Sequence, residues 1–167
     1  MNLEYKNNVI YPPNFIEIEG SVIFLAGPIQ SATVWQEEAA QFLYKLKPEV
    51  YIANPRRDYP EGEFVYEKQV DWETHFLRRA EKKGVILFWL AKEFKHNCAR
   101  PYAQTSRFEL GEWKARHEFL GSKLVLGIEK EFSNDRYIKR RFSQDCPSVP
   151  ICSSLEETCK TALELIL

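Results

Sequence analysis

The chain has 167 residues, of which 44% are hydrophobic and 28% charged, a composition typical of one globular domain and unlike that of disordered chains. The formal net charge is −1, which argues against a protein that binds nucleic acid polymers or acidic membrane surfaces through an overall positive charge. The longest uninterrupted apolar run, residues 85–91, is too short to cross a bilayer, and residues 1–8 contain no apolar segment of a secretory signal. We therefore expect a cytoplasmic protein without a membrane partner.

The N-terminal segment is expected to be an extended arm over residues 1–20. Residues 9–18 alternate between apolar and polar side chains and are interrupted by Pro12-Pro13. Because proline cannot donate to a central β-ladder, this segment fits an edge strand or an arm.

Two strand-helix pairs follow. Residues 21–26 form a continuous apolar run that predicts a strand buried on both faces, and it ends in Gly27-Pro28-Ile29 before a helix over 33–46. A second strand over 50–53 ends in Asn54-Pro55-Arg56-Arg57, and a helix over 67–82 comes next. These units predict a parallel sheet whose ligands bind at the carboxyl ends of the strands.

The remaining elements continue this alternation. We expect strands over 84–90, 123–128 and 148–151, and helices over about 105–120, 133–142 and 155–167. Ser133-Asn134 is expected to cap the second of these helices, and Ser154 the third through a capping box. The long connection over 91–104 is of the kind that is functional or mobile in compact domains. The pattern predicts a single α/β domain over 1–167, a three-layer sandwich around a four- to five-stranded, mostly parallel, flavodoxin-like sheet.

The stretch from Thr105 to Trp113 carries one acid, Glu109, between apolar residues. We expect Thr105 or Ser106 to cap the helix, Glu109 to lie in its first turn, and Phe108, Leu110 and Trp113 to face inward. A carboxylate in a first turn is stabilised by the helix dipole, so a purely structural role is one interpretation of Glu109. The other interpretation is that Glu109 faces a pocket and acts as a nucleophile.

Several polar and aromatic residues are expected at the same edge of the sheet. Guanidinium groups suit phosphate, carboxylate or hydroxyl-rich ligands, although Arg57 could also pair with Asp58 in a solvated loop. Gln69, Trp72 and Glu73 lie in the first turns of their helix, within reach of the same crevice. The four cysteines have no CxxC spacing, so we expect free thiols, no metal and no cofactor.

Five of these segments, in this order and spacing, resemble the nucleoside 2-deoxyribosyltransferase-like family over about residues 21–128. The segments are residues 24–29, 54–57 and 69–73, then 86–90, which include Trp89, and 107–113. The resemblance implies a glutamate nucleophile at Glu109 and an acid at Glu73 that supports the departing nucleobase. It also implies substrate contacts from Gly27, Pro28, Ile29, Arg56, Arg57, Gln69, Trp72, Trp89, Thr105 and Arg107.

The implied function is cleavage of the N-glycosidic bond of a (2-deoxy)nucleoside or nucleotide, with the sugar passed to another nucleobase or to water. The expected partners are a small-molecule substrate and further copies of the chain, because sites in this family are often completed by a neighbouring subunit. The chain departs from the family pattern at Phe24, Ala103 and residues 81–84, where some members have a tyrosine, an acid and an Ala-Asp pair. The alternatives are a nucleoside 5′-monophosphate N-glycosidase and a non-catalytic nucleotide-binding or sensing module that kept the pocket.

Overall fold

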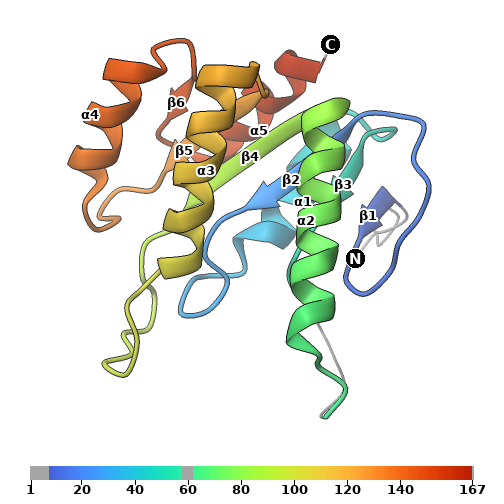
Figure 1. The fold of residues 1–167 in the computed structure, drawn as a ribbon, viewed down its shortest axis with the longest axis horizontal. Helices are drawn as coiled ribbons and strands as arrows, with labels where there is room; N and C mark the ends of the chain where they lie inside the picture. The colour runs from blue at the N-terminus through green and yellow to red at the C-terminus, as the bar shows by residue number, and fades with distance from the viewer. Residues whose placement is uncertain (1–7, 58–61, 167) are drawn as a thin grey trace.

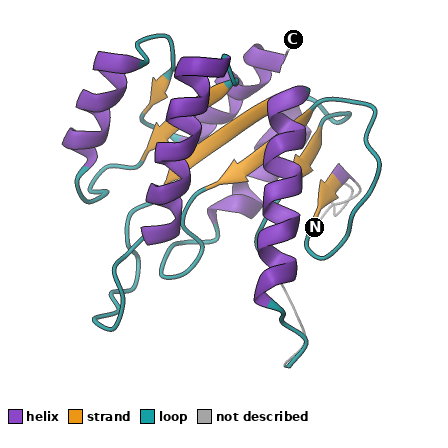
Figure 2. Ribbon diagram, in the orientation of Figure 1, coloured by secondary structure: helices purple, strands orange, loops and turns teal. Residues whose placement is uncertain are grey.

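The computed structural model describes residues 8–57 and 62–166, in which strands and helices alternate along the chain (Figures 1 and 2). The strands are β1 (Val9–Ile10), β2 (Val22–Ala26), β3 (Tyr51–Ala53), β4 (Gly84–Leu90), β5 (Leu124–Ile128) and β6 (Ile151–Cys152). The helices are α1 (Trp35–Leu46), α2 (Tyr66–Lys82), α3 (Gln104–Leu120), α4 (Asp135–Asp145) and α5 (Leu155–Ile166). The α/β class predicted from the sequence is confirmed.

Across the described residues, six strands form one sheet in the order β1-β3-β2-β4-β5-β6, and every neighbouring pair is parallel. The five strands from β3 to β6 have the flavodoxin-like order. The predicted count of four to five strands is too low by one, because Val9 and Ile10 pair with Ile52 and Ala53 at the edge. The chain turns away at Pro12-Pro13, so the edge strand has only two residues.

Helices cover both faces of the sheet and complete the three layers. Figure 1 shows α2, α3 and α4 on the near face, with α1 and α5 behind it. Alternate residues of each strand point to opposite faces, so Phe24 joins the core under α2 and α3 whereas Ile23 joins the core under α1 and α5. Residues of β2, β4 and β5 are buried throughout, as expected for central parallel strands.

The start of α3 differs from the prediction. The helix begins at Gln104, its N-cap residue is Ala103 in the left-handed conformation (φ 55°), and no side chain caps it. Thr105 and Ser106 therefore lie inside the first turn, and Glu109 is the sixth helical residue rather than a first-turn acid. The prediction that Phe108 faces inward is wrong: it is 77% exposed, because residues two apart do not share a helix face and Leu110 points into the core. Leu110 and Trp113 are buried as expected.

The two other predicted caps have different outcomes. Asn134 precedes α4 in the left-handed conformation and makes no side-chain cap hydrogen bond, so that prediction is wrong. Ser154 Oγ accepts a hydrogen bond from the Glu157 backbone N–H at 3.2 Å, and Glu157 Oε2 accepts one from the Ser153 N–H at 3.1 Å. The predicted cap at Ser154 is confirmed, whereas the reciprocal bond of a capping box is displaced by one residue, because Glu157 accepts from Ser153 instead of Ser154.

No helix in the described part of the chain is both long and apolar enough to span a membrane. The four cysteines are free thiols, with Cys98 exposed and the other three buried.

Candidate functional site

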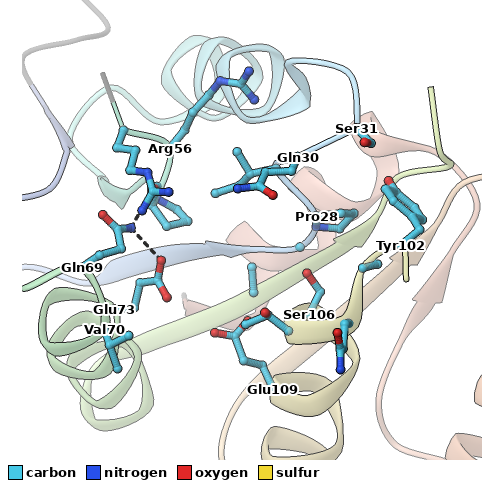
Figure 3. Close-up of a pocket in the computed structure, with 18 of the residues that line it drawn as sticks. Pro28, Gln30, Ser31, Arg56, Gln69, Val70, Glu73, Tyr102, Ser106 and Glu109 are labelled. Carbon is cyan, nitrogen blue, oxygen red and sulfur yellow. Dashed lines mark hydrogen bonds between the residues drawn. The ribbon is translucent and has the colours of Figure 1, made fainter. Parts of the chain in front are cut away.

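A cavity of about 460 Å³ opens at the carboxyl ends of β2, β3 and β4, between α2 and α3 (Figure 3). Residues predicted from the sequence that line it are Gly27, Pro28, Ile29, Arg56, Arg57, Gln69, Glu73, Thr105 and Glu109. The lining residues that sequence reasoning did not assign include Gln30, Ser31, Phe64, Tyr66, Val70, Glu93, Arg100, Tyr102 and Ser106. The structure thus brings three loops and two helices together around one space.

The first wall is the turn after β2. Gly27 has φ 150°, and a Cβ on it would lie 2.2 Å from the carbonyl oxygen of Trp89. The close approach of the backbone at Gly27 to the backbone of β4 therefore requires glycine. Trp35 Nε1 donates to the Pro28 carbonyl at 2.8 Å, and the buried Gln36 side chain donates to the same oxygen at 3.4 Å. These bonds hold the backbone of Pro28 and Ile29 at the rim of the cavity.

The second wall is the arginine-bearing loop after β3. Asn54 Oδ1 accepts a hydrogen bond from the Arg56 N–H at 2.9 Å, and Arg56 Nη1 donates to Gln36 Oε1 at 3.4 Å. The Arg57 guanidinium lies over the Phe64 ring, 3.5 Å from its centroid, which is a favourable cation–π arrangement. The proposed pair between Arg57 and Asp58 lies outside the described residues.

The two acids face each other across the cavity from neighbouring helices (Figure 3). Glu73 Oε1 on α2 accepts a hydrogen bond from Gln69 Nε2 at 2.6 Å. Burial raises the pKa of Glu73, although the Gln69 hydrogen bond and the charge of Arg57 oppose this. On α3, burial and then the negative charges of Glu73 and Glu112 raise the pKa of Glu109 from 4.5 to about 8. Both carboxyl groups therefore bind their protons more tightly than they would in water.

The third wall is the connection between β4 and α3. The Tyr102 hydroxyl donates to the carbonyl of Ala91 at 2.7 Å and approaches that of Lys92 at 3.1 Å, closing the loop on itself. Burial and the charges of Glu129 and Glu93 raise the pKa of Tyr102, so its hydroxyl remains a donor. The length of this loop indicated a functional segment, but nothing in the sequence indicated which of its side chains reach the cavity.

Three residues predicted to contact a ligand lie elsewhere. Trp72 is fully buried, its Nε1 donates to the Asn14 carbonyl at 2.7 Å, and its ring packs 4.6 Å from that of Phe76. The helical rotation that points Gln69 and Glu73 into the cavity turns Trp72 into the core instead.

The other two lie on different sides of the sheet. The side chain of Trp89 belongs to the core under α1 and α5, and only its backbone meets the turn at Gly27. Arg107 donates to the carbonyl and hydroxyl of Ser133 at 2.7 and 2.8 Å, and stacks on Phe132 at 4.5 Å. The face of the strand or helix that carries each residue decides where its side chain points, so closeness in sequence to cavity residues does not bring Trp89 or Arg107 into the cavity.

The described residues contain no group of three or more His, Cys, Asp or Glu side chains placed to hold a metal ion. The cavity instead offers carboxyl groups, side-chain amides, hydroxyls and guanidinium groups. This set suits hydrogen bonding to a sugar or a nucleobase and charge pairing with an anionic group.

Comparison with protein families identifies the family of this chain. A family model described as nucleoside 2-deoxyribosyltransferase like matches residues 20–126, more than half of the chain, from just before β2 into β5. No protein of curated function matches the sequence. The match spans every strand end and both helices that build the cavity, and it confirms the resemblance that the sequence motifs indicated. The chain therefore belongs to the nucleoside 2-deoxyribosyltransferase-like family, which supports a glycosyl-transfer role in general and implies small-molecule nucleoside substrates.

Proposed function

We propose that the protein cleaves the N-glycosidic bond of a (2-deoxy)nucleoside or nucleotide and passes the sugar to another nucleobase or to water. The observation that carries this proposal is the placement of Glu73 and Glu109, which project from α2 and α3 into one cavity beside Arg57. Paired carboxyl groups in different environments are a common arrangement for glycosidic bond cleavage, with one as nucleophile and the other as acid.

Glu109 is the proposed nucleophile. Its carboxylate attacks the anomeric carbon as the bond to the nucleobase breaks, and the bonding electron pair leaves with the base. Glu73 gives its proton to a ring nitrogen of that base. In the second half-reaction an acceptor nitrogen or a water oxygen attacks the anomeric carbon, Glu73 takes up the proton, and the glycosyl ester releases the Glu109 carboxylate.

The pKa of Glu109 bears directly on this scheme. A nucleophilic carboxylate must be ionised, whereas a pKa of about 8 keeps most Glu109 side chains protonated at neutral pH in the free protein. We therefore expect kcat/KM to rise with pH toward about 8, because that parameter reports the ionisation of the free enzyme.

The guanidinium groups favour substrates that carry a 5′-phosphate as a variant of the same reaction. Arg56, Arg57 and Arg100 line the cavity, and Thr105 adds a hydroxyl. Because arginine binds phosphate through paired N–H donors, a nucleoside monophosphate is expected to bind more tightly than the nucleoside.

A second candidate is a non-catalytic nucleotide-binding module. Ala103 and Phe24 both line the cavity, so two positions where some relatives carry polar groups are apolar here. This candidate predicts ligand binding without turnover.

One experiment separates the candidates. The protein is incubated with 2′-deoxynucleosides and their monophosphates, with and without an acceptor base, and free base and exchanged nucleoside are measured chromatographically. Intact mass is recorded to detect a glycosyl adduct. We expect Glu109→Gln to abolish turnover but to keep ligand affinity within about tenfold, ~1.4 kcal/mol.

Glu112→Gln is the matched control, because Glu112 is an exposed acid one turn further along the same helix. Ligand binding by the folded protein without base release or exchange would refute the enzyme and support the binding module. Absence of both binding and turnover across the panel would refute both candidates.

A further inference from the structure

The side-chain amide of Gln69 connects the arginine-bearing loop to one of the two acids. Gln69 lies on α2, is 5% exposed, and borders the cavity. Its Nε2 donates to the Pro55 carbonyl at 3.0 Å and to Glu73 Oε1 at 2.6 Å (Figure 3). Both N–H groups of the amide are therefore used.

The Pro55 carbonyl fixes which end of the amide faces Glu73. A carbonyl oxygen can only accept a hydrogen bond, so the NH₂ end of Gln69 must point toward Pro55. A flipped amide would place its own oxygen against the Pro55 oxygen and would lose that hydrogen bond. In this orientation Gln69 Oε1 is buried without a hydrogen-bond partner. The lost hydration of that oxygen lowers the stability of the fold, so the two bonds from Nε2 are kept at a cost in free energy.

This orientation has a consequence for the proton on Glu73. Gln69 Nε2 donates to Oε1, and a carboxyl carbonyl oxygen is a stronger acceptor than the hydroxyl oxygen, so the bond favours a neutral Glu73 that carries its proton on Oε2. Figure 3 shows the second carboxyl oxygen of Glu73 turned toward the cavity and α3. The amide thus selects the oxygen that can donate into the cavity.

We propose that Gln69 is a positioning residue that keeps the proton of Glu73 on Oε2, so that the acid presents its O–H to the departing nucleobase. This inference rests on the proposed function. In the step it serves, the proton moves from Oε2 to a ring nitrogen of the base while the glycosidic electron pair moves to that base. The carboxylate that remains on Glu73 keeps the Gln69 hydrogen bond.

The surrounding charges are compatible with this role. Arg57 from the loop after β3 favours the ionised carboxyl group, whereas burial favours the neutral form, and Glu109 faces Glu73 from α3. Arg56 and Tyr66 are the other nearby titratable groups that line this side of the cavity. The Gln69 bond stabilises the ionised form, so its removal is expected to raise the pKa of Glu73 further.

The test compares substrates whose nucleobase must be protonated to depart with substrates whose nucleobase is a better leaving group and depends less on protonation. The first pair is 2′-deoxyguanosine and 7-methyl-2′-deoxyguanosine, whose methylated base departs without protonation. The second pair is 2′-deoxyuridine and 5-fluoro-2′-deoxyuridine, in which the fluorinated base is the better leaving group. Whichever pair the wild-type protein accepts is used.

Gln69→Met has a similar length but no hydrogen-bonding amide. We expect kcat/KM to fall about 100-fold on the substrate that needs protonation, the scale of general acid catalysis, and less than about threefold on 7-methyl-2′-deoxyguanosine. For the pyrimidine pair the loss is expected to be smaller on the fluorinated member. Glu73→Gln should give the same pattern, and the limb of the pH profile assigned to Glu73 should move to higher pH in Gln69→Met.

Controls separate this role from a structural one. Lys68→Met changes an exposed neighbour on the same helix and should leave both rates unchanged. If Gln69→Met does not fold, Gln69→Glu retains the size of the side chain, but its carboxylate has no N–H to donate to Pro55 or Glu73, and the same selective loss is expected. Equal losses on both substrates, or no loss on either, with an active wild-type protein would overturn the role of Gln69 alone. A wild-type protein that releases or exchanges no base across the full panel of 2′-deoxynucleosides and their monophosphates would instead overturn the proposed function.

Discussion

The raised pKa of Glu109 makes a prediction about stability that does not depend on any reaction. A carboxyl group whose pKa is higher in the folded chain than in the unfolded chain binds its proton more tightly when folded. Its contribution favours folding below the unfolded pKa, near 4.5, and is lost as pH rises through the folded value of about 8. Glu109→Gln replaces the carboxyl group by a neutral side chain of the same shape and removes this dependence.

The magnitude follows from the two pKa values. A difference from 4.5 to about 8, at ~1.4 kcal/mol per pH unit, sets an upper limit of ~5 kcal/mol. Glu109 borders an open cavity, so water reduces the cost of its charge, and we expect roughly half of this limit, ~2 kcal/mol. Glu109→Gln should therefore match the wild-type protein at pH 5 and exceed its free energy of unfolding by about 2 kcal/mol at pH 9.

Urea denaturation followed by tryptophan fluorescence at pH 5, 7 and 9 measures this difference. The chain has four tryptophans, and Trp72 and Trp113 are buried beneath α2 and α3. The exposed acid Glu112 provides the control, because Glu112→Gln should change the free energy of unfolding by less than ~0.5 kcal/mol at each pH. An equal effect of Glu109→Gln at pH 5 and pH 9, or a loss of stability at pH 9, would show that the charge of Glu109 is compensated and its pKa is not raised.

Three further predictions each test one contact seen in the structure. Gly27→Ala should lower the free energy of unfolding by ~2–4 kcal/mol in chemical denaturation, because its Cβ would lie 2.2 Å from the Trp89 carbonyl at a φ of 150°. Ser154→Ala should cost ~1 kcal/mol through loss of the α5 cap, measured as a shift in Tm. Arg107→Ala should cost ~1 kcal/mol through its contacts with Ser133, but should leave calorimetric ligand affinity within about twofold because Arg107 does not line the cavity.

Each of these has a result that would contradict it. A Gly27→Ala protein as stable as wild type would mean that the two backbones separate without cost. For the cap, Ser153→Ala is the neighbouring control, and an equal loss from both substitutions would exclude a specific cap. A tenfold loss of ligand affinity in Arg107→Ala would place that guanidinium at the substrate after all.

Features that depend on local hydrophobic patterns were predicted more accurately than features that depend on contacts between distant segments. The strand predicted over 84–90 has those bounds in the structure, and the helix predicted over 67–82 begins one residue earlier. These elements follow from local hydrophobic patterns. The α3 helix also begins one residue earlier than predicted, but its expected cap at Thr105 or Ser106 is wrong. The turn before it depends on the left-handed Ala103 and on Tyr102, which is tied to Ala91 at the far end of the loop.

The same distinction separates the correct from the incorrect site assignments. The residues directly beyond β2 and β3 were placed correctly, because parallel strands present their carboxyl ends at one edge of the sheet. Trp72 and Trp89 were not, because they were assigned by their place in a motif and not by the face of the element that carries them.

The sequence alone determined that this protein has a parallel α/β sheet, with Glu73 and Glu109 expected near the carboxyl ends of its strands. The succession of strands, helices and loops along the chain follows from hydrophobic patterns that extend over a few residues. Only the tertiary structure decided which side chains enter the cavity, how Gln69 holds Glu73, and why the pKa of Glu109 is about 8. These properties depend on helix rotation and on burial by segments far apart in the chain, and no local pattern contains that information.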